Sequence, residues 1–470
     1  MQLKSIRSVL LIVAPNIYNP TFFSYFPPLG ILYIAASLEN NGCKVNVLDA
    51  AIKKMSYAEI VKNIQEEKPD LIGITCTTET RFEMKELTEL IRKKIPDLFI
   101  VVGGAHVTFC PEETLLSTKA DLVVLGEGDN TIAELISGKP FADIEGIVYR
   151  DEENIKTNPL RKRIDDLGKL PFPARHLIDL DKYPGFSVRK QKNTHINTNR
   201  GCPFGCIYCS ASKLWGMNSR SISAKKVVEE VEMLLSDYGI NLFYFYDDMF
   251  TANKKRAEKI CNLFIEKKLN IKWGTSTRID AINKDLLVLM SDAGCVQINY
   301  GVETLNNNVC KYIGRKALLN EVKEAVKDSI DAGIENVQLY ILIGLPGDDP
   351  QGLKKTVVDL LSTQATLLAI QVLRIYPGTE LERIARQKKI LSEKFSWYEF
   401  YDQGMPGLPT VPLYTEQPRD NLIKQYDFLR KYMRFSSALR RRLPKKILKL
   451  YVKFDCIFFI FLTKIINWQG

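Results

Sequence analysis

The first 140 residues alternate short apolar runs with amphipathic stretches. The apolar runs predict strands at Ser8–Ala14, Lys44–Asp49, Asp70–Thr75, Phe99–Gly103 and Leu122–Leu125. Between them, apolar positions at helical spacing predict helices at Leu29–Asn41, Ser56–Glu67, Glu79–Lys94, Glu112–Thr118 and Asn130–Ser137. Strand–helix units in succession imply right-handed crossovers. The pattern therefore predicts a Rossmann-like, doubly wound parallel sheet, with its ligand beyond the carboxyl ends of the strands.

A second alternating series begins near residue 193. It predicts strands at Thr194–Asn199, Leu242–Tyr246, Ile271–Ser276, Cys295–Tyr300, Asn336–Ile343 and Leu368–Ile375. Helical patterns lie between them, at Ala224–Tyr238, Lys254–Glu266, Lys284–Ala293 and Asn320–Ala332. Six such units predict a partial (β/α)6 barrel of the TIM type, with its site at the carboxyl ends of the strands.

The chain then divides into four segments. Residues 1–140 form the Rossmann-like unit, and residues 141–190 form a linker with Pro159, Pro171, Pro173 and Pro184 and a hairpin strand near Gly146–Arg150. Residues 191–390 form the partial barrel. Residues 391–470 form a helical C-terminal extension. The fold class is α/β.

Composition adds the cellular setting. The chain has 470 residues, of which 46% are hydrophobic and 26% charged, as is ordinary for folded proteins. The apolar run Val9–Ala14 ends at Pro15 without a cleavage site, so it indicates a buried strand rather than a signal peptide. A cytoplasmic location follows, in which metal or redox roles for the ten cysteines are favoured over disulfides.

Positive charge is concentrated at the C-terminal end. The whole chain carries a formal net charge of +10, and residues 430–470 contain eleven Lys or Arg but only one acidic residue, Asp455. The remainder is close to neutral, so no basic surface for nucleic acid is expected on the main body.

Three cysteines carry the strongest chemical signal. Cys202, Cys206 and Cys209 give a C-x3-C-x2-C spacing in a loop with Gly201, Pro203 and Gly205. Thiolates are soft ligands suited to iron–sulfur clusters, and close spacing allows one loop to reach three irons. A structural zinc loop or chance spacing is the alternative. The other seven cysteines lack such spacing and are expected in the core.

Over residues 190–385 the chain resembles the radical S-adenosylmethionine superfamily, whose signature is this spacing with an aromatic residue, here Tyr208, before the last cysteine. The resemblance implies that the three cysteines bind a [4Fe–4S] cluster and that S-adenosylmethionine chelates its fourth iron. Cleavage of the cofactor would then yield a 5′-deoxyadenosyl radical. Tyr208 would border the adenine.

Further residues at predicted strand ends match the places where this superfamily binds S-adenosylmethionine. They are Asp247 and Asp248, Ser276 and Arg278, Glu303, and Gly344. The chain has Asp-Asp where Gly-Gly-Glu is commoner, so the choice between the two aspartates stays open. Ser276 and Arg278 would pair with the cofactor carboxylate. Each residue taken singly is equally compatible with a solvated loop.

Residues 5–145 resemble the cobalamin-binding domain of one subclass of this superfamily, which includes radical methyltransferases and ring-forming cyclases. The matching residues follow predicted strands: Thr75 and Thr77, Gly103 and Gly104, and Gly126, Glu127 and Gly128. The resemblance implies that their loops wrap the nucleotide tail of cobalamin. Small residues suit a backbone that lies against a bulky ligand.

One feature of many cobalamin proteins is missing. The D-x-H-x-x-G loop is absent, since residues 15–19 read Pro-Asn-Ile-Tyr-Asn. Cobalt therefore has no protein histidine ligand, or the domain is only a scaffold. For His106 we favour hydrogen bonding or packing over cobalt ligation. A nicotinamide site is disfavoured, because no G-x-G-x-x-G follows the first strand.

The C-terminal tail has the pattern of a basic amphipathic helix. Arg440–Arg442, Lys445, Lys446, Lys449 and Lys453 alternate with apolar residues, and the apolar run Cys456–Leu462 is too short to span a bilayer. Such a helix would cover the open edge of the barrel or lie on an anionic membrane surface. A helix on the membrane surface would give the protein a peripheral location on the cytoplasmic membrane face.

These observations give one leading hypothesis. It is a radical S-adenosylmethionine enzyme that uses cobalamin to transfer a methyl group to an unactivated carbon of a small-molecule or lipid substrate. Its electron would come from an external donor. A cyclase or rearrangement enzyme without methyl transfer is the alternative, and a non-catalytic sensor is less favoured. No catalytic acid or base is assigned.

Overall fold

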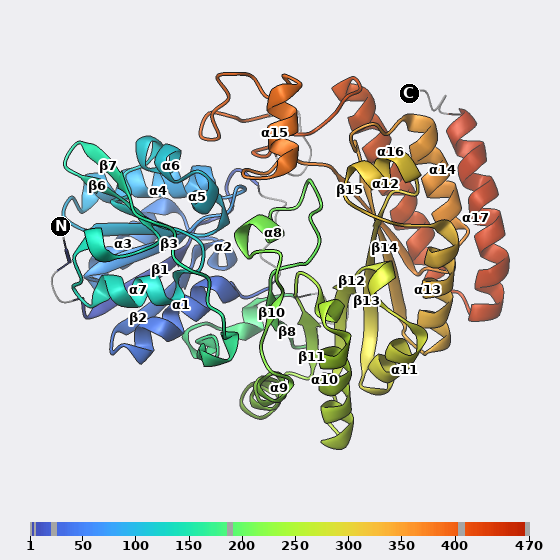
Figure 1. Ribbon diagram of the computed structural model, residues 1–470, viewed down its shortest axis with the longest axis horizontal. Helices are drawn as coiled ribbons and strands as arrows, with labels where there is room; N and C mark the ends of the chain where they lie inside the picture. Colours follow the sequence, from blue (N-terminus) through green and yellow to red (C-terminus); the bar gives the residue numbers. More distant parts are fainter. Residues whose placement is uncertain (1, 4–5, 20–25, 186–190, 403–408, 466–470) are drawn as a thin grey trace.

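The computed structural model describes residues 2–3, 6–19, 26–185, 191–402 and 409–465. Figure 1 shows two α/β units side by side, an N-terminal one in blue and teal and a larger one in green to red. Residues 20–25, in the loop after the first strand, lie outside the described residues.

The N-terminal unit contains a seven-stranded sheet in the order β2-β1-β3-β4-β5-β6-β7. Its strands are β1 (Ser8–Val13), β2 (Lys44–Asp49), β3 (Leu71–Thr75), β4 (Phe99–Gly103), β5 (Leu122–Val124), β6 (Ile147–Asp151) and β7 (Asn154–Thr157). The first five are parallel, and the hairpin β6–β7 adds two antiparallel strands at one edge. The prediction of a Rossmann-like parallel sheet is confirmed.

Helices cover both faces of this sheet. They are α1 (Leu29–Asn40), α2 (Ala50–Lys53), α3 (Tyr57–Glu67), α4 (Arg81–Lys94), α5 (Ala105–Phe109), α6 (Pro111–Ser117) and α7 (Gly128–Ile136). Helices α1 and α7 pack against Leu11 on one face, while α3 and α4 pack against Leu10 and Ile12 on the other. Alternation of side chains along β1 thus supplies two cores, as a doubly wound sheet requires.

The second unit is a six-stranded parallel sheet in the order β15-β14-β13-β12-β11-β8. Its strands are β8 (Asn193–Ile196), β11 (Leu242–Phe245), β12 (Lys272–Thr277), β13 (Cys295–Glu303), β14 (Asn336–Ile343) and β15 (Leu367–Val372). The helices are α8 (Ala211–Leu214), α9 (Ala224–Tyr238), α10 (Lys254–Glu266), α11 (Lys284–Asp292), α12 (Asn307–Tyr312), α13 (Leu319–Asp331) and α14 (Pro350–Leu361). Because β8 and β15 are the two edges, the barrel is partial, as predicted.

The strand predicted over Thr194–Asn199 is interrupted. The Asp247 carboxylate accepts hydrogen bonds from the N–H groups of Thr198 and Asn199, which pull the chain out of the ladder after β8. Asn199 and Arg200 then form β9 (Asn199–Arg200), which pairs antiparallel with β10 (Arg220–Ser221). This ribbon, hereafter the clasp, closes the loop that carries the three cysteines.

The C-terminal extension is helical. It contains α16 (Arg419–Arg440) and α17 (Lys445–Ile465), and α15 (Glu380–Gln387) precedes it. The basic helix predicted from Arg440 onward is two helices, because Pro444 has no N–H and disfavours a helical residue before it. Helix α16 packs along the edge strand β15, and α17 packs on α14 and α16. No helix within the described ranges is long and apolar enough to cross a membrane.

A segment after α15 joins the two units. The Arg81 guanidinium donates to the Trp397 carbonyl at 2.5 Å, and the Trp397 N–H donates to the Glu113 carboxylate at 2.7 Å. The Tyr398 hydroxyl donates to the Thr114 hydroxyl at 3.0 Å. These buried contacts fix the barrel unit against α4 and α6.

Candidate active site

The cysteine loop lies between the two strands of the clasp. Cys202, Cys206 and Cys209 are each partly exposed and all line one cavity. Gly201 has a φ of +103°, and a Cβ there would lie 2.6 Å from the Asn218 carbonyl oxygen, so only glycine fits. Nowhere in the described ranges do three metal-binding side chains converge on a single ion. A cubane makes a different demand, since it takes one thiolate at each of three irons.

This cavity, of about 490 Å³, lies at the carboxyl ends of the barrel strands. Asp248 follows β11, Ser276 stands in β12, and Glu303 is the last residue of β13. Arg374 and Tyr376 follow β15. The cysteines therefore face polar residues from successive strands, as the parallel topology predicts.

Arg278 supplies an unused donor to the cavity lining. Its Nε and Nη2 atoms form two hydrogen bonds with Asp280, at 2.8 and 2.7 Å, and its guanidinium stacks 3.8 Å from the Phe204 ring centroid. The buried Nη1 atom has no hydrogen-bond partner in the described part of the chain. A buried guanidinium donor without a partner is well suited to a ligand carboxylate.

Glu303, Arg315 and Tyr208 form a second polar group in the same lining. Arg315 forms an ion pair with Glu303, and its Nε atom donates to the Tyr208 hydroxyl at 2.9 Å. Although burial acts against the charge, Glu303 and Tyr208 hold the pKa of Arg315 above its usual value. Glu303 adopts a φ of +66°, a strained conformation for a residue with a side chain. The bulge of β13 at this point turns its carboxylate toward the cavity.

The structure separates the two adjacent aspartates. Asp247 is buried, and its carboxylate is occupied by Thr198 and Asn199; burial raises its pKa to about 6. Asp248 lines the cavity, and its carboxylate accepts one hydrogen bond, from the Gly201 N–H at 3.0 Å. Burial also raises the pKa of Asp248. Asp248 is therefore the member of the pair that faces the cavity.

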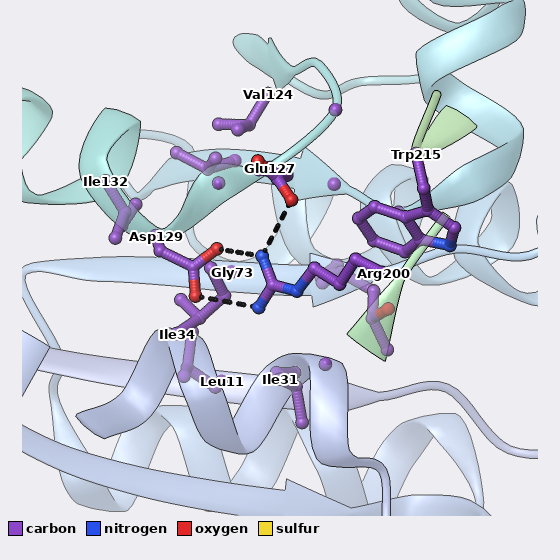
Figure 2. Close-up of a pocket in the computed structure, with 18 residues that line it drawn as sticks. Leu11, Ile31, Ile34, Gly73, Val124, Glu127, Asp129, Ile132, Arg200 and Trp215 are labelled. Carbon is purple, nitrogen blue, oxygen red and sulfur yellow. Dashed lines mark hydrogen bonds and ion pairs between the residues drawn. The ribbon is translucent and has the colours of Figure 1, made fainter. Parts of the chain in front are cut away.

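A second cavity, of about 160 Å³, lies at the carboxyl edge of the N-terminal sheet. Apolar side chains line it, with Leu11, Ile31 and Ile34 on one side and Val124 on the opposite side (Figure 2). Glycines form much of the remaining wall. Gly104 has a φ of +114°, and a Cβ there would meet the Cys76 carbonyl oxygen at 2.5 Å. The wall thus brings bare backbone to the cavity, which suits a bulky apolar ligand group.

The clasp contributes to this second cavity. Figure 2 shows the Arg200 guanidinium between Glu127 and Asp129, with Trp215 beside it. Its Nη1 atom lies 3.1 Å from Glu127 and 3.0 Å from Asp129. Although burial acts against the charge, a hydrogen bond from Arg220 and the nearby Arg200 hold the pKa of Glu127 below its usual value. Arg200 thus lines the second cavity and stands two residues before Cys202, which lines the first.

Comparison with known proteins agrees with this two-site arrangement. The B12 binding domain family matches residues 15–136, and the Radical SAM superfamily matches residues 196–360. An uncharacterized methyltransferase of Pyrococcus horikoshii, PH0819, is 30% identical over 370 residues, which cover 78% of this chain and 80% of that protein. The chain belongs to the B12-binding group of the radical S-adenosylmethionine superfamily. The resemblance inferred from the sequence is confirmed.

Other relatives differ in the reaction that their names state. Cytidylyl-2-hydroxyethylphosphonate methyltransferase of Streptomyces wedmorensis is 28% identical, over 68% of this chain and 69% of that protein. The anaerobic magnesium-protoporphyrin IX monomethyl ester cyclase of Rubrivivax gelatinosus is 27% identical, over 74% of this chain and 64% of that protein. The group therefore contains both methyltransferases and cyclases.

Solved structures share the fold. The cobalamin-dependent S-adenosylmethionine radical enzyme OxsB has a TM-score of 0.74 over 98% of this chain and 72% of its own, at 19% identity. The methyltransferase TsrM of Kitasatospora setae has a TM-score of 0.72 over 87% of this chain and 86% of its own, also at 19% identity. The predicted α/β fold class, with its partial barrel, is confirmed.

Membership of this group implies the cofactors of the two matched families. They are a [4Fe–4S] cluster and S-adenosylmethionine for the barrel, and cobalamin for the N-terminal unit. Radical S-adenosylmethionine enzymes typically act on small molecules and take an electron from a donor. The residues present fit these groups: partly exposed thiols, a partnerless guanidinium donor and a glycine-walled cavity.

The residues predicted to bind S-adenosylmethionine fall into two sets. Tyr208, Asp248, Ser276, Arg278 and Glu303 line the cavity with the cysteines. Asp247 and Gly344 are not among the lining residues. Gly344, with a φ of +83°, lies instead against the Tyr414 carbonyl and the Leu422 side chain.

The residues predicted to surround cobalamin also fall into two sets. Thr75, Gly103, Gly104, Gly126, Glu127 and Gly128 line the second cavity. Thr77 does not, and its N–H donates to the Thr80 hydroxyl at 3.1 Å, within its own turn.

His106 is buried away from both cavities. Its Nδ1 atom lies 3.2 Å from the Thr78 hydroxyl, and its ring packs against Trp397 and Tyr398. Burial lowers the pKa of His106 to about 3. The geometry supports the packing and hydrogen-bonding role that the sequence favoured.

Several site residues were missed at the sequence level. Arg200, Asp129 and Trp215 line the N-terminal cavity, and Arg315 joins Glu303 to Tyr208. Of these residues, only Arg200 could have been found from its neighbours in the sequence, because it stands beside Gly201 and Cys202. The partners of Arg315 lie 12 and 107 positions away in sequence, beyond the reach of a local motif.

Proposed function

We propose that this chain is a cobalamin-dependent radical S-adenosylmethionine methyltransferase that methylates an unactivated carbon. The observation that carries the proposal is that the segment around the three cysteines reaches the N-terminal cavity, since Arg200 and Trp215 on either side of them line it. Two cofactors that act on one substrate must hold their reactive atoms close together. The methyltransferases among the relatives support the same reaction.

Each predicted residue has a proposed role. Cys202, Cys206 and Cys209 are the thiolate ligands of the cluster. Tyr208, Asp248, Ser276, Arg278 and Glu303 bind S-adenosylmethionine, and Thr75, Gly103, Gly104, Gly126, Glu127 and Gly128 surround cobalamin. Asp247 and Gly344 support the loops beside the first site, and Thr77 supports the second. When bound, these cofactors supply a 5′-deoxyadenosyl radical and a methyl group.

Arg278 is the residue to which we assign the cofactor carboxylate. Asp280 and Phe204 fix its guanidinium, so that the Nη1 donor is already oriented when a ligand arrives. Preorganised donors lower the entropic cost of binding. Arg278→Lys should therefore weaken S-adenosylmethionine binding by about tenfold or more, because an ammonium cannot keep both the Asp280 pair and the ligand contact.

The substrate is proposed to enter between the two units. The Tyr376 hydroxyl, after β15, donates to the Glu79 carboxylate of the N-terminal unit at 2.8 Å. This contact closes one side of the barrel cavity against the loop after β3. Tyr246 points into the same region, where its ring lies beside His195 and Phe26. A cluster of aromatic side chains of this kind suits a small-molecule or lipid substrate with an extended apolar part.

Anaerobic reconstitution tests the proposal. The loaded protein should show cluster and corrinoid absorption together, and with substrate it should release 5′-deoxyadenosine and S-adenosylhomocysteine. Replacement of Cys202, Cys206 and Cys209 by Ala should abolish cluster absorption and deoxyadenosine but retain bound cobalamin. The matched control is Cys110→Ala, a partly exposed cysteine outside both cavities. Loss of deoxyadenosine in the control as well would contradict the assignment.

A cyclase is the second candidate, favoured by the similarity to the Rubrivivax enzyme. The same assay separates the two, because deoxyadenosine without S-adenosylhomocysteine would favour cyclisation or rearrangement. A sensor would keep its physiological function after the triple cysteine replacement.

We further propose an external reductant, because cleavage of S-adenosylmethionine by a radical route consumes an electron. A cytoplasmic location, with peripheral contact at the inner membrane face, would suit a lipid substrate. An electron-transfer assay with flavodoxin or ferredoxin as donor, against dithionite as reference, tests the first point.

A further inference from the structure

Helix α17 has apolar side chains on two opposite faces. Leu448, Val452 and Phe459 are buried against the rest of the protein. The opposite side of the helix carries Ile447, Leu450, Phe454, Ile457 and Phe461, hereafter the outer stripe. Their exposure ranges from 49% to 71%. The members are spaced by three or four positions, so they lie on one face over a length of about 21 Å.

The orientation of α17 is fixed by a buried polar group. Asp455, on the inner face, forms an ion pair with Arg440 at 2.7 Å, and it accepts hydrogen bonds from Tyr432 and Ser436, each at 2.5 Å. Rotation of the helix to bury the outer stripe would break all three contacts and leave Arg440 without its counter-ion. The stripe is therefore held outward by the most strongly constrained charge in this region.

The surroundings of the outer stripe are basic. Lys453 and Lys464 are exposed and stand within about one turn of stripe residues, next to Phe454 and Phe461. Residues 430–470 contain eleven Lys or Arg, and their one acidic residue, Asp455, is buried and paired. An exposed apolar strip beside uncompensated positive charge is the pattern of a helix that lies in the plane of an anionic lipid surface.

The position of α17 in the molecule agrees with such contact. In Figure 1 it forms the outer edge of the barrel unit, on the side away from the N-terminal sheet. Helix α17 contacts α14 and α16, and Phe459 with the partly buried Cys456, Phe458 and Leu462 packs in the barrel core, whereas no member of the outer stripe does. A second copy of the chain is a poor occupant, because it would bring two strongly positive segments together.

We propose that α17 docks on an anionic membrane surface, with the outer stripe inserted at the headgroup boundary and Lys453 and Lys464 at the phosphates. The helix would lie on the membrane rather than cross it. This inference does not depend on the reaction catalysed at the cofactor sites, so either can fail without the other.

Co-sedimentation of the reconstituted full chain with vesicles tests it. Vesicles of phosphatidylcholine with phosphatidylglycerol should bind the protein, and vesicles of phosphatidylcholine alone should bind it weakly. The double variant Leu450→Ser, Phe454→Ser should lower the partition coefficient by at least about tenfold. Each of Lys453→Gln and Lys464→Gln should lower it by about fivefold, and added salt should reduce the effect of both.

Matched controls come from the N-terminal unit. Leu116, at 75% exposure, and Lys119 are exposed on the far unit, so Leu116→Ser and Lys119→Gln should leave partitioning unchanged. The stripe variants should keep the parent melting temperature, because the replaced side chains are exposed. Equal partitioning of stripe and control variants would overturn the proposal. So would a parent dimer that the stripe variant converts to a monomer, since the occupant would then be a second copy.

Point variants are preferable to removal of the tail. Arg440 donates to the carbonyl oxygens of Leu361, Thr363 and Ala365, at the end of α14 and just after it. Truncation before Arg440 would remove these bonds and uncover the inner face of α14. Loss of membrane binding in a truncated chain would then report unfolding as much as docking.

Discussion

Arg440 and Asp455 show what a single residue pair contributes to this molecule. Their side chains are 0% and 1% exposed, and the guanidinium bonds three carbonyl oxygens as well as the carboxylate. Two charges removed from water are tolerated only when every donor and acceptor is used. The pair thereby joins α16 and α17 to the end of α14.

Asp455→Asn should lower the free energy of unfolding by about 3–5 kcal/mol, because the Arg440 charge would remain buried without its counter-ion. Urea unfolding measures the loss. The double variant Arg440→Met, Asp455→Leu should recover part of it, since no unpaired charge remains. The control is Asp331→Asn, which breaks the exposed pair with Lys327. Equal unfolding midpoints for Asp455→Asn and the control would refute this account of the pair.

His106 makes stability depend on pH. Burial lowers its pKa to about 3 in the folded chain, from an ordinary value of 6.5. Below pH 6.5 the unfolded chain gains a proton that the folded chain does not, so the free energy of unfolding falls as the pH falls. The slope is up to about 1.4 kcal/mol per pH unit for this group.

His106→Gln should therefore flatten the dependence of stability on pH by about one proton between neutral pH and about pH 5. His195, whose pKa burial also lowers to about 3, should account for part of the slope that remains. Urea titrations at several pH values give both slopes. Parallel slopes for the parent and the variant would show that His106 is accessible to water in the folded chain.

Local motifs could be predicted at the residue scale, and long-range partners could not. The three cysteines stand within eight residues of chain, and they line one cavity as expected. By contrast, Arg200 meets Glu127 and Asp129 across more than 70 positions. Nothing in the local pattern around either end specifies that pairing, because it depends on how the two units pack.

At the scale of elements, the clasp is the part of the fold that joins the two sites. Its strands are only two residues each, and they are held by side chains as well as by the ladder. Arg200 on β9 and Arg220 on β10 both bind Glu127. A short ribbon anchored in this way positions the cysteine loop relative to the N-terminal cavity.

Arg200→Gln should weaken cobalamin binding by about tenfold or more, because Glu127 and Asp129 would stay buried with less positive charge beside them. Spectroscopic titration of the apoprotein with hydroxocobalamin measures this affinity. Arg163→Gln is the matched control, an arginine that bonds the cysteine loop from its exposed side through the Leu214 and Lys213 carbonyls. Unchanged affinity in Arg200→Gln would show that the clasp does not take part in cobalamin binding.

Most elements could be predicted because buried parallel strands read as continuous apolar runs between polar turns. β2, β4 and β14 coincide with their predicted bounds, as do α9 and α10. The exceptions have identifiable causes. Asp247 ends β8 early by binding the next N–H groups, and Pro444 divides the predicted tail helix. The first cause is a contact over about 50 positions, which a local pattern does not contain.

At the scale of the whole molecule, the two units are one structure because the segment after α15 returns to the N-terminal sheet. Arg81 is fully buried there, and it donates to the carbonyl oxygens of Thr78, Trp397 and Phe400. Two of these three acceptors belong to the C-terminal extension. The position of one unit against the other therefore depends in part on contacts outside both cavities.

Arg81→Ala should uncouple the two units. Calorimetry of the parent should give one unfolding transition, whereas the variant should give two, because three buried carbonyl oxygens lose their donor at the interface. Hydroxocobalamin should raise only one of the two transitions of the variant, that of the N-terminal unit, since ligand binding stabilises the unit that holds it. Arg92→Ala is the control on the same helix, because Arg92 bonds only within the N-terminal unit, through Pro96, Leu98, Lys119 and Asp121. That control should lower the melting temperature and keep a single transition. If both variants unfold in one step, the contacts of Arg81 are not what makes the two units unfold together.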